Sequence, residues 1–376
     1  MTTISAVKAE SYDTQVVEQA MDELLGLIGS MEHYVKPGEK VLIKPNMLEG
    51  LSPEKAVTTH PEVVRAVIKA VKAAGAVPVV GDSPAMGNTL KAAQKTGILA
   101  ICQEEGIQLL PFQHAIDIPF LAGTMVRKFV LAQELKAVDK VISLGKMKTH
   151  SLTGVTGGIK NLFGFVVGPN KAQFHLRMQK RSDFAAMLVD LAQAVNPVLF
   201  IIDGIVGMEG DGPRNGTPCK GNILLAGTNG FAVDMVMAEM MGFRGDKLPV
   251  VAQALRQGLV PLRAEITVTG SAQNTSLSFR EPKNMSALDT VLPKWLAAWG
   301  QQQLTAKPVI APNCVGCRRC AEHCPPQAIT LINNQASIDY ARCIRCYCCQ
   351  ELCPHNAVNL KNGTLLNAIL KLCGRK

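Results

Sequence analysis

Eight cysteines follow a spacing that is typical of iron–sulfur cluster ligands. The segments 314-CVGCRRCAEHCP-325 and 343-CIRCYCCQELCP-354 both read C-x2-C-x2-C-x3-C-P. The copies are offset by 29 residues and stay similar beyond their prolines, so they form an internal repeat. Three closely spaced cysteines can bind three irons of one cubane, whereas the fourth, beside a proline that turns the chain, reaches the other cluster. The pattern therefore predicts two [4Fe–4S] clusters.

The crossing of the fourth cysteine assigns the ligands of each cluster. We expect cluster one on Cys314, Cys317, Cys320 and Cys353. We expect cluster two on Cys343, Cys346, Cys349 and Cys324. Zinc ribbons also pair cysteines, but they lack the third cysteine and the C-x3-C-P step. Cys348 has no counterpart in the first copy, where Arg319 stands, and we interpret it as a spare thiol near a cluster.

Composition indicates the compartment and the class of partner. The chain has 376 residues and twelve cysteines, with no signal peptide and no apolar run long enough to span a membrane. We therefore expect a cytoplasmic protein whose cysteines bind metal. The net charge is +9, and residues 307–376 carry nine basic against three acidic side chains. Such a patch could bind nucleic acid, but we attribute it to compensation of cluster charge and expect no nucleic-acid partner.

The larger part of the chain alternates short apolar runs with helical patterns, which position the other candidate residues. Strands are predicted at 41–46, 76–84, 107–112, 125–131, 139–146, 198–204, 222–227 and 264–270. Helices are predicted at 61–75, 88–106, 182–194 and 230–242. This alternation predicts an α/β fold with a mainly parallel sheet covered by helices on both faces. A small α+β ferredoxin-like domain follows.

We expect four segments along the chain. They are an α/β domain over 1–270, a linker with one helix near 291–301 over 271–307, the iron–sulfur domain over 308–362, and a tail over 363–376. The tail is apolar with a basic end, and it could dock on the protein body or touch a membrane surface.

Polar residues gather where the predicted strands end. In parallel sheets, ligands bind at the carboxyl ends of strands, so these side chains are expected to share one site. They are Lys44, Asn46, Asp82, Lys146, Lys148, His150, Asp203 and, in the glycine-rich loop 204–216, Asp211. Asp234, in the last predicted helix, could face this site or a neighbouring helix.

The segment 146-KMKTHSLTGVTGGIKNLFG-164 predicts an anion site. It brings Lys146, Lys148 and Lys160 beside a glycine-rich turn and a helix that begins near Ile159, with Asn161 in its first turn. Free N–H groups at a helix start, together with ammonium groups, bind phosphate or carboxylate. The segment is not a Walker A loop, because it lacks G-x4-G-K-[ST]. A solvated basic loop with turn glycines is the alternative.

These motifs carry two family resemblances. The segment 146–164, with K-P-N at 44–46 and D-G-I-x-G-M-E-G-D-G-P at 203–213, resembles the family catalogued as domain of unknown function 362, over residues 4 to 270. Residues 308–362 resemble bacterial two-cluster ferredoxins, which implies two short hairpins and two helical turns. Members of the first family often carry a ferredoxin module.

A more distant resemblance links the chain to the nickel-dependent lactate racemase group. His150, Gly157-Gly158-Ile159-Lys160, Gly164 and His175 fall at a similar spacing, although the pattern departs around Asn161. In that group the lysine holds a nickel cofactor covalently and the last histidine is a metal ligand. The resemblance implies that Lys160 could hold a further cofactor, or could act as an anion-binding or Schiff-base lysine.

The sequence is therefore interpreted as an iron–sulfur oxidoreductase. Two clusters would pass electrons from a soluble partner protein to a small anionic substrate or cofactor, with His150 as proton donor and Lys160 as the second catalytic residue. One alternative is a non-catalytic electron carrier or cofactor-assembly protein. Another is a racemase-like enzyme with a cofactor at Lys160.

Overall fold

The computed structural model describes residues 2–85, 87–168, 170–178, 180–282 and 306–361. The helix predicted near 291–301 and the tail over 363–376 lie outside these residues. Residues 271–282 contact the large domain, for example through Leu277 N–H, which donates to Met240 O at 2.7 Å.

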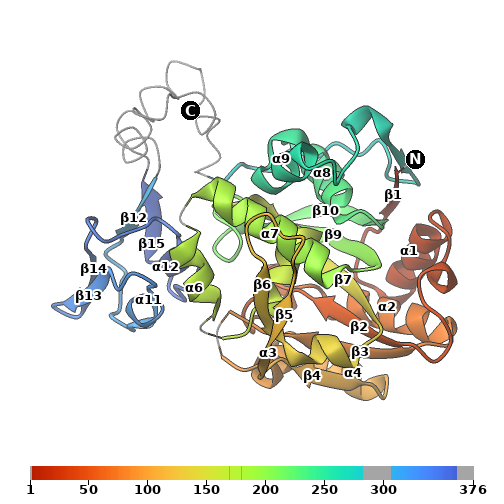
Figure 1. Ribbon diagram of the computed structural model, residues 1–376, viewed down its shortest axis with the longest axis horizontal. Coiled ribbons are helices and arrows are strands. Elements are labelled where there is room, and N and C mark those ends of the chain that lie inside the picture. The colour runs from red at the N-terminus through yellow and green to blue at the C-terminus, as the bar shows by residue number, and fades with distance from the viewer. Residues whose placement is uncertain (1, 86, 169, 179, 283–305, 362–376) are drawn as a thin grey trace.

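A nine-stranded sheet forms the centre of the large domain (Figure 1). Its order is β11 (Ile266–Thr269), β1 (Thr2–Lys8), β10 (Thr217–Gly227), β9 (Leu199–Glu209), β7 (Lys140–His150), β2 (Lys40–Pro45), β3 (Val77–Asp82) and β4 (Gln108–Pro111), with β8 (Gly154–Thr156) on β7. Strands β9, β7, β2, β3 and β4 are parallel. Strand β10 pairs antiparallel with both β9 and β1. Strands β5 (Ala115–Pro119) and β6 (Lys128–Ala132) form a separate hairpin.

Helices cover both faces of the sheet because its strands are apolar on both sides. In β2, Val41 and Ile43 belong to one buried cluster, whereas Leu42 belongs to the other. The first cluster packs on α1 (Thr14–Gly26), α2 (Pro61–Ala73) and α4 (Ile98–Glu104). The second packs on α7 (Arg181–Val195), α8 (Gly230–Met240) and α9 (Pro249–Arg256). The predicted mainly parallel α/β fold is confirmed.

Two predicted elements differ from the structure. The single helix expected at 88–106 is two helices, α3 (Thr89–Lys95) and α4, because Gly97 adopts a left-handed φ of 77° that ends the first. The strand expected to end at Gly204 continues as β9 to Glu209 and pairs with Thr217 of β10. Much of the expected glycine-rich loop is therefore a hairpin whose turn covers 210–216.

The iron–sulfur domain repeats itself in structure as in sequence. Helices α11 (Arg319–Glu322) and α12 (Cys348–Glu351) occupy equivalent positions of the two copies, as do β13 (Ile329–Ile332) and β15 (Val358–Lys361). Strand β13 forms a hairpin with β14 (Gln335–Ile338). Strand β15 pairs instead with β12 (Lys307–Ile310), so the second strand pair joins distant parts of the domain and is not the second hairpin that the resemblance implied.

Candidate functional site

A cavity of about 640 Å³ lies between the two domains. It opens at the carboxyl ends of β2, β3 and β7 and is closed by the short helices α5 (Gly158–Asn161) and α6 (Asn170–Arg177) and by the iron–sulfur domain. Residues of α6 and of α12 (Cys348–Glu351) both line the cavity, and Figure 1 shows these two helices where the two domains meet. The basic and histidine side chains that line it are Lys44, Lys148, His150, Lys160, Lys171 and His175 of the large domain and His323 of the iron–sulfur domain. Its volume is that of a small-molecule site.

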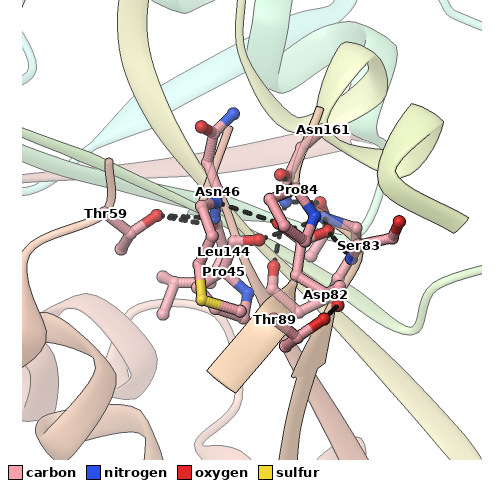
Figure 2. Close-up of polar contacts among 12 residues, drawn as sticks. Pro45, Asn46, Thr59, Asp82, Ser83, Pro84, Thr89, Leu144 and Asn161 are labelled. Atoms are coloured by element: carbon pink, nitrogen blue, oxygen red, sulfur yellow. Dashed lines mark hydrogen bonds and ion pairs between the residues drawn. The ribbon is translucent and has the colours of Figure 1, made fainter. Parts of the chain in front are cut away.

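At the ends of β2 and β3, a buried ion pair anchors the cavity wall. Lys44 Nζ lies 2.7 Å from Asp82 Oδ1 and donates to Asn161 Oδ1 at 3.1 Å. Asn161 Nδ2 in turn donates to Lys44 O at 2.9 Å, which fixes α5 against β2. Figure 2 shows Asp82, the last residue of β3, and Thr89 Oγ1, which donates to the main-chain oxygen of Asp82 at 2.9 Å. These residues meet as the strand-end argument expected.

Lys148 is a completely buried cation that has no carboxylate partner in the described part of the chain. Its Nζ donates to Val57 O at 2.6 Å and to Asn46 Oδ1 at 3.2 Å. Burial pushes the pKa of this ammonium well below its ordinary value, and the neighbouring cations Lys146 and Lys160 push it in the same direction. An anion in the cavity would relieve both effects.

His150 and Glu351 face each other across the domain boundary. His150 Nδ1 accepts from the N–H groups of Leu152 at 3.0 Å and Thr153 at 3.3 Å, so we assign the ring hydrogen to Nε2. Nε2 lies 3.3 Å from Glu351 Oε1, but the two atoms are not aligned as a hydrogen bond and both are buried without a partner among the described residues. Buried polar atoms of this kind indicate a missing ligand or water. Burial lowers the pKa of His150 and raises that of Glu351.

Two further cavity residues, Lys171 and His175 of α6, were not among the predicted site residues. Lys171 Nζ donates to Ser83 O, Ser83 Oγ and Pro84 O at 2.7, 3.0 and 3.1 Å, and burial lowers its pKa to about 7. His175 stacks on Phe184 with ring centroids 4.7 Å apart, and burial lowers its pKa to about 3. The racemase resemblance pointed to His175, whereas no motif marked Lys171.

Lys146 and Asp203 do not share this site, contrary to prediction. Lys146 Nζ lies 2.7 Å from Asp203 Oδ2 and donates to Tyr12 Oη at 2.8 Å. Tyr12 Oη also donates to Asp203 Oδ1 at 2.8 Å, the Tyr12 ring stacks on the His60 ring, and the main-chain N–H of His60 donates to Asp203 Oδ2 at 2.9 Å. All these groups are mutually satisfied, and neither Lys146 nor Asp203 lines the cavity. They hold β7, β9 and the segment before α2 together.

The predicted position of Asp211 was also wrong, because the 210–216 turn serves another purpose. Arg214 Nε of that turn lies 2.5 Å from Glu49 Oε2, and Arg214 Nη1 donates to Cys353 O at 2.7 Å. Glu49 also lies 3.4 Å from Arg319 of the iron–sulfur domain. Asn215 adds a bond to Gln350 O at 3.0 Å. The turn therefore docks the iron–sulfur domain, and Asp211 does not line the cavity.

The helix start that was expected to bind an anion is already occupied by the protein. Asp234 of α8 accepts from the N–H groups of Gly158 at 2.6 Å and Ile159 at 3.2 Å. A Cβ on Gly157 would lie 2.1 Å from Asp234 Oδ1, so only glycine admits this carboxylate. Asp234 thus caps α5, and any cavity anion must bind the side-chain cations instead.

The Asp234 cap predicts a pH-dependent stability difference. Burial raises the pKa of Asp234 to about 7, despite the two N–H donors that lower it. The unfolded carboxyl loses its proton first, so this group's contribution to stability is largest below pH 4 and is lost as the pH rises to about 7. We expect the stability of the wild type relative to Asp234→Asn to fall over that range, because asparagine does not titrate. Denaturant midpoints from pH 4 to 8 test this, with Asp22→Asn at an exposed position as control; a pH-independent difference would contradict it.

The cysteines line two separate small cavities in the iron–sulfur domain. One is lined by Cys314, Cys317, Cys320 and Cys353. The other is lined by Cys324, Cys343, Cys346, Cys349 and Cys348. Main-chain N–H groups donate to sulfur at 3.2 Å from Ala328 to Cys324 and from Ala357 to Cys353, which are equivalent positions of the repeat. The cysteines are also spread out, since no three His, Cys, Asp or Glu among the described residues converge on a single ion.

This arrangement fits [4Fe–4S] clusters. Each cavity collects cysteines from both copies of the repeat, as the crossed ligand assignment requires. Donation from N–H groups to sulfur suits thiolate ligands. Cys324 and Cys348 also line the large cavity, so the second cysteine cavity adjoins the lysine-rich one.

Comparison with known families agrees with both resemblances. Residues 41–239 match the model of a domain of unknown function, DUF362, and residues 313–357 match that of a 4Fe-4S dicluster domain. The thylakoid-associated protein sll1697 of Synechocystis sp. is 35% identical over 299 residues, which cover 78% of this chain and 92% of that protein. No helix among the described residues is long and apolar enough to cross a membrane.

Two solved structures are more distantly similar. The lactate racemase apoprotein from Thermoanaerobacterium thermosaccharolyticum matches with a TM-score of 0.37 and 15% identity, over 59% of this chain and 53% of that one. A protein from Thermotoga maritima matches with a TM-score of 0.34 and 10% identity, over 54% and 52%. The chain thus spans about half the length of each.

Proposed function

The chain belongs to the DUF362 family and carries a 4Fe-4S ferredoxin domain, and from this premise we propose that it is an oxidoreductase that reduces or oxidises a small anion in the interdomain cavity. Two clusters would be held by the two sets of four cysteines assigned above. When bound, they supply one-electron transfer. The other steps depend on side chains of the large domain.

One observation carries the proposal. Cys324, an expected ligand of cluster two, lines the same cavity as Lys148, His150 and Lys160 of the large domain. Cluster two would therefore adjoin the substrate without an intervening layer of protein. A carrier that only docks on a partner enzyme needs no such cavity beside its cluster.

The charges of the cavity support an anionic substrate. Of its four lysines, only Lys44 forms an ion pair with a carboxylate in the described part of the chain. Lys148 and Lys171 donate to neutral oxygens instead, and their depressed pKa values show how strongly the site disfavours uncompensated cations. A phosphate or carboxylate would supply the missing charge.

His150 is placed to handle a proton at the substrate. Two main-chain donors fix its Nδ1, so Nε2 carries the ring hydrogen, and Nε2 has no hydrogen-bond acceptor among the described residues. Because its pKa is lowered, the ring is neutral near pH 7 and can donate from Nε2. Asn161, Asn46 and Asp82 orient the neighbouring lysines.

We also infer a soluble redox partner and a cytoplasmic location. All eleven cysteines of the described residues are free of disulfides, as expected in a reducing compartment. The name of the Synechocystis relative describes association with thylakoids, and a peripheral contact with a membrane is compatible with the same chemistry.

The proposal predicts that a cavity anion will oxidise the reduced protein. Anaerobic protein reduced with dithionite is mixed with 2-oxo acids, phosphate esters or dinucleotides, and the visible absorbance is followed. We expect one class to accelerate reoxidation, and His150→Gln to slow it by about 10²–10⁴-fold with full iron content. His33→Gln, an exposed histidine of the large domain, is the control. Equal rates in His150→Gln and wild type would contradict the role of His150.

A further inference from the structure

The four lysines of the cavity differ in what their amine groups contact. Lys44 is bound to Asp82, Asn161 and a main-chain oxygen. Lys148 donates to two oxygens and Lys171 to three. Lys160 alone has no hydrogen-bond or ion-pair partner among the described residues, and its Nζ lies 4.8 Å from the centroid of the Phe163 ring.

The surroundings of Lys160 shift its side chain toward the neutral amine. Burial lowers the pKa of Lys160, and Lys44 lowers it further, whereas Glu351 and Cys348 act in the opposite direction. The side chain is only partly exposed, and it lines the cavity. A lysine that only binds an anion is usually held in place by hydrogen bonds to its ammonium group. Lys160 instead packs against the Phe163 ring, so its nitrogen forms no hydrogen bond with the described residues.

Two neighbouring groups complete a site for a carbonyl compound. His150 Nε2–H lies buried without an aligned acceptor among the described residues, and Thr156 Oγ1, also on the cavity wall, is buried and unpartnered in the same sense. Both groups can form a hydrogen bond with an oxygen atom of a ligand, and both line the cavity together with Lys160. Lys148 and Lys171 line the same cavity and favour a negatively charged substituent.

We propose that Lys160 is an amine nucleophile that forms an imine with an anionic carbonyl compound of the 2-oxo acid class. The inference rests on the proposed function and specifies its substrate. The Nζ lone pair adds to the carbonyl carbon, and a C–N bond replaces the C–O π bond. Both N–H hydrogens of the neutral amine then leave with the carbonyl oxygen as water, while His150 Nε2–H donates a hydrogen bond to that oxygen. No oxidant or reductant is consumed in this step.

The test is reductive trapping on the full-length, cluster-loaded protein. Pyruvate or 2-oxoglutarate is added under anaerobic conditions with sodium cyanoborohydride, and peptides are mapped by mass spectrometry. The expected adduct adds the mass of the probe less one oxygen atom, at Lys160, at least tenfold above exposed Lys136. Lys160→Arg keeps a cation but should lose the adduct, whereas Lys136→Arg should retain it. Methyl pyruvate, which keeps the ketone of pyruvate but lacks its charge, should label Lys160 more weakly than either acid.

The outcomes separate this inference from the proposed function. Absence of a Lys160 adduct with both acids, or labelling no greater than at Lys136, overturns the imine, and this result needs only the wild-type protein. Equal labelling by methyl pyruvate overturns the anionic class. An adduct at Lys160 without anion-dependent reoxidation of the clusters supports the imine but counts against the oxidoreductase. Reoxidation without an adduct supports the oxidoreductase but overturns the imine.

Discussion

Replacing Cys324 and Cys346 together by serine is expected to leave about half of the iron, because both cysteines are assigned to cluster two. Replacing Cys324 and Cys317 together should leave almost none, because one variant residue then falls in each cluster. The two cysteine cavities predict this contrast, since Cys324 and Cys346 line one and Cys317 lines the other. Iron and sulfide content of anaerobically purified protein measures it.

The same two variants also test the alternative ligand assignment, in which the fourth cysteine does not cross to the other cluster. If each copy of the repeat held its own cluster, Cys324 and Cys317 would share a cluster and the two iron contents would be exchanged. Cys219→Ser is the matched control, because this cysteine belongs to β10 of the large domain and should keep all the iron. Loss of cluster two alone should also abolish reoxidation by the cavity substrate.

Gly164→Ala is expected to destabilise the large domain by about 3–5 kcal/mol, the range measured when a buried ion pair is broken. A Cβ at this position would lie 2.2 Å from Asp82 Oδ1 and 2.6 Å from Lys44 Nζ. These two atoms form the buried pair of the cavity wall, and each has little room to move because Asn161 and the main chain of Met47 hold them. The free energy of unfolding from denaturant titration is the measurement.

Gly26→Ala provides the control for this variant. Gly26 ends α1, and an added Cβ meets nothing within 4 Å. It should be neutral or slightly stabilising, by up to about 1 kcal/mol, because alanine loses less backbone entropy than glycine in a helix. Equal stability of the Gly164 and Gly26 variants would show that the ion pair tolerates displacement.

The parts that could be predicted from sequence are those set by local spacing. The cysteine repeat and the alternation of strands and helices depend on neighbours a few residues apart, and both agree with the structure. The meeting of Lys44, Asp82 and Lys148 followed from the general position of ligands at the carboxyl ends of parallel strands.

The errors concern which distant group a buried charge contacts. Lys146 pairs with Asp203, 57 residues away, and Asp234 caps Gly158 across 76 residues. Lys146 and Asp203 are polar and buried and lie near the ends of the strands that the sequence predicted, so the local pattern did not separate a satisfied structural group from a free one. Glu351 could not be assigned either, because its position in the cavity depends on how the two domains dock.

The docking contacts have a consequence for the cavity itself. One carboxylate, Glu49, is shared by Arg214 and Arg319, and Arg319 is the more exposed of the two partners. The ion pair between Arg319 and Glu49 is therefore the docking contact that dissolved salt weakens most. The walls of the cavity come from the large domain and from the iron–sulfur domain, so separating the two would open the cavity and move Cys324 away from Lys148 and His150. Ionic strength is therefore expected to affect the proposed reaction even though it alters none of the residues that line the cavity.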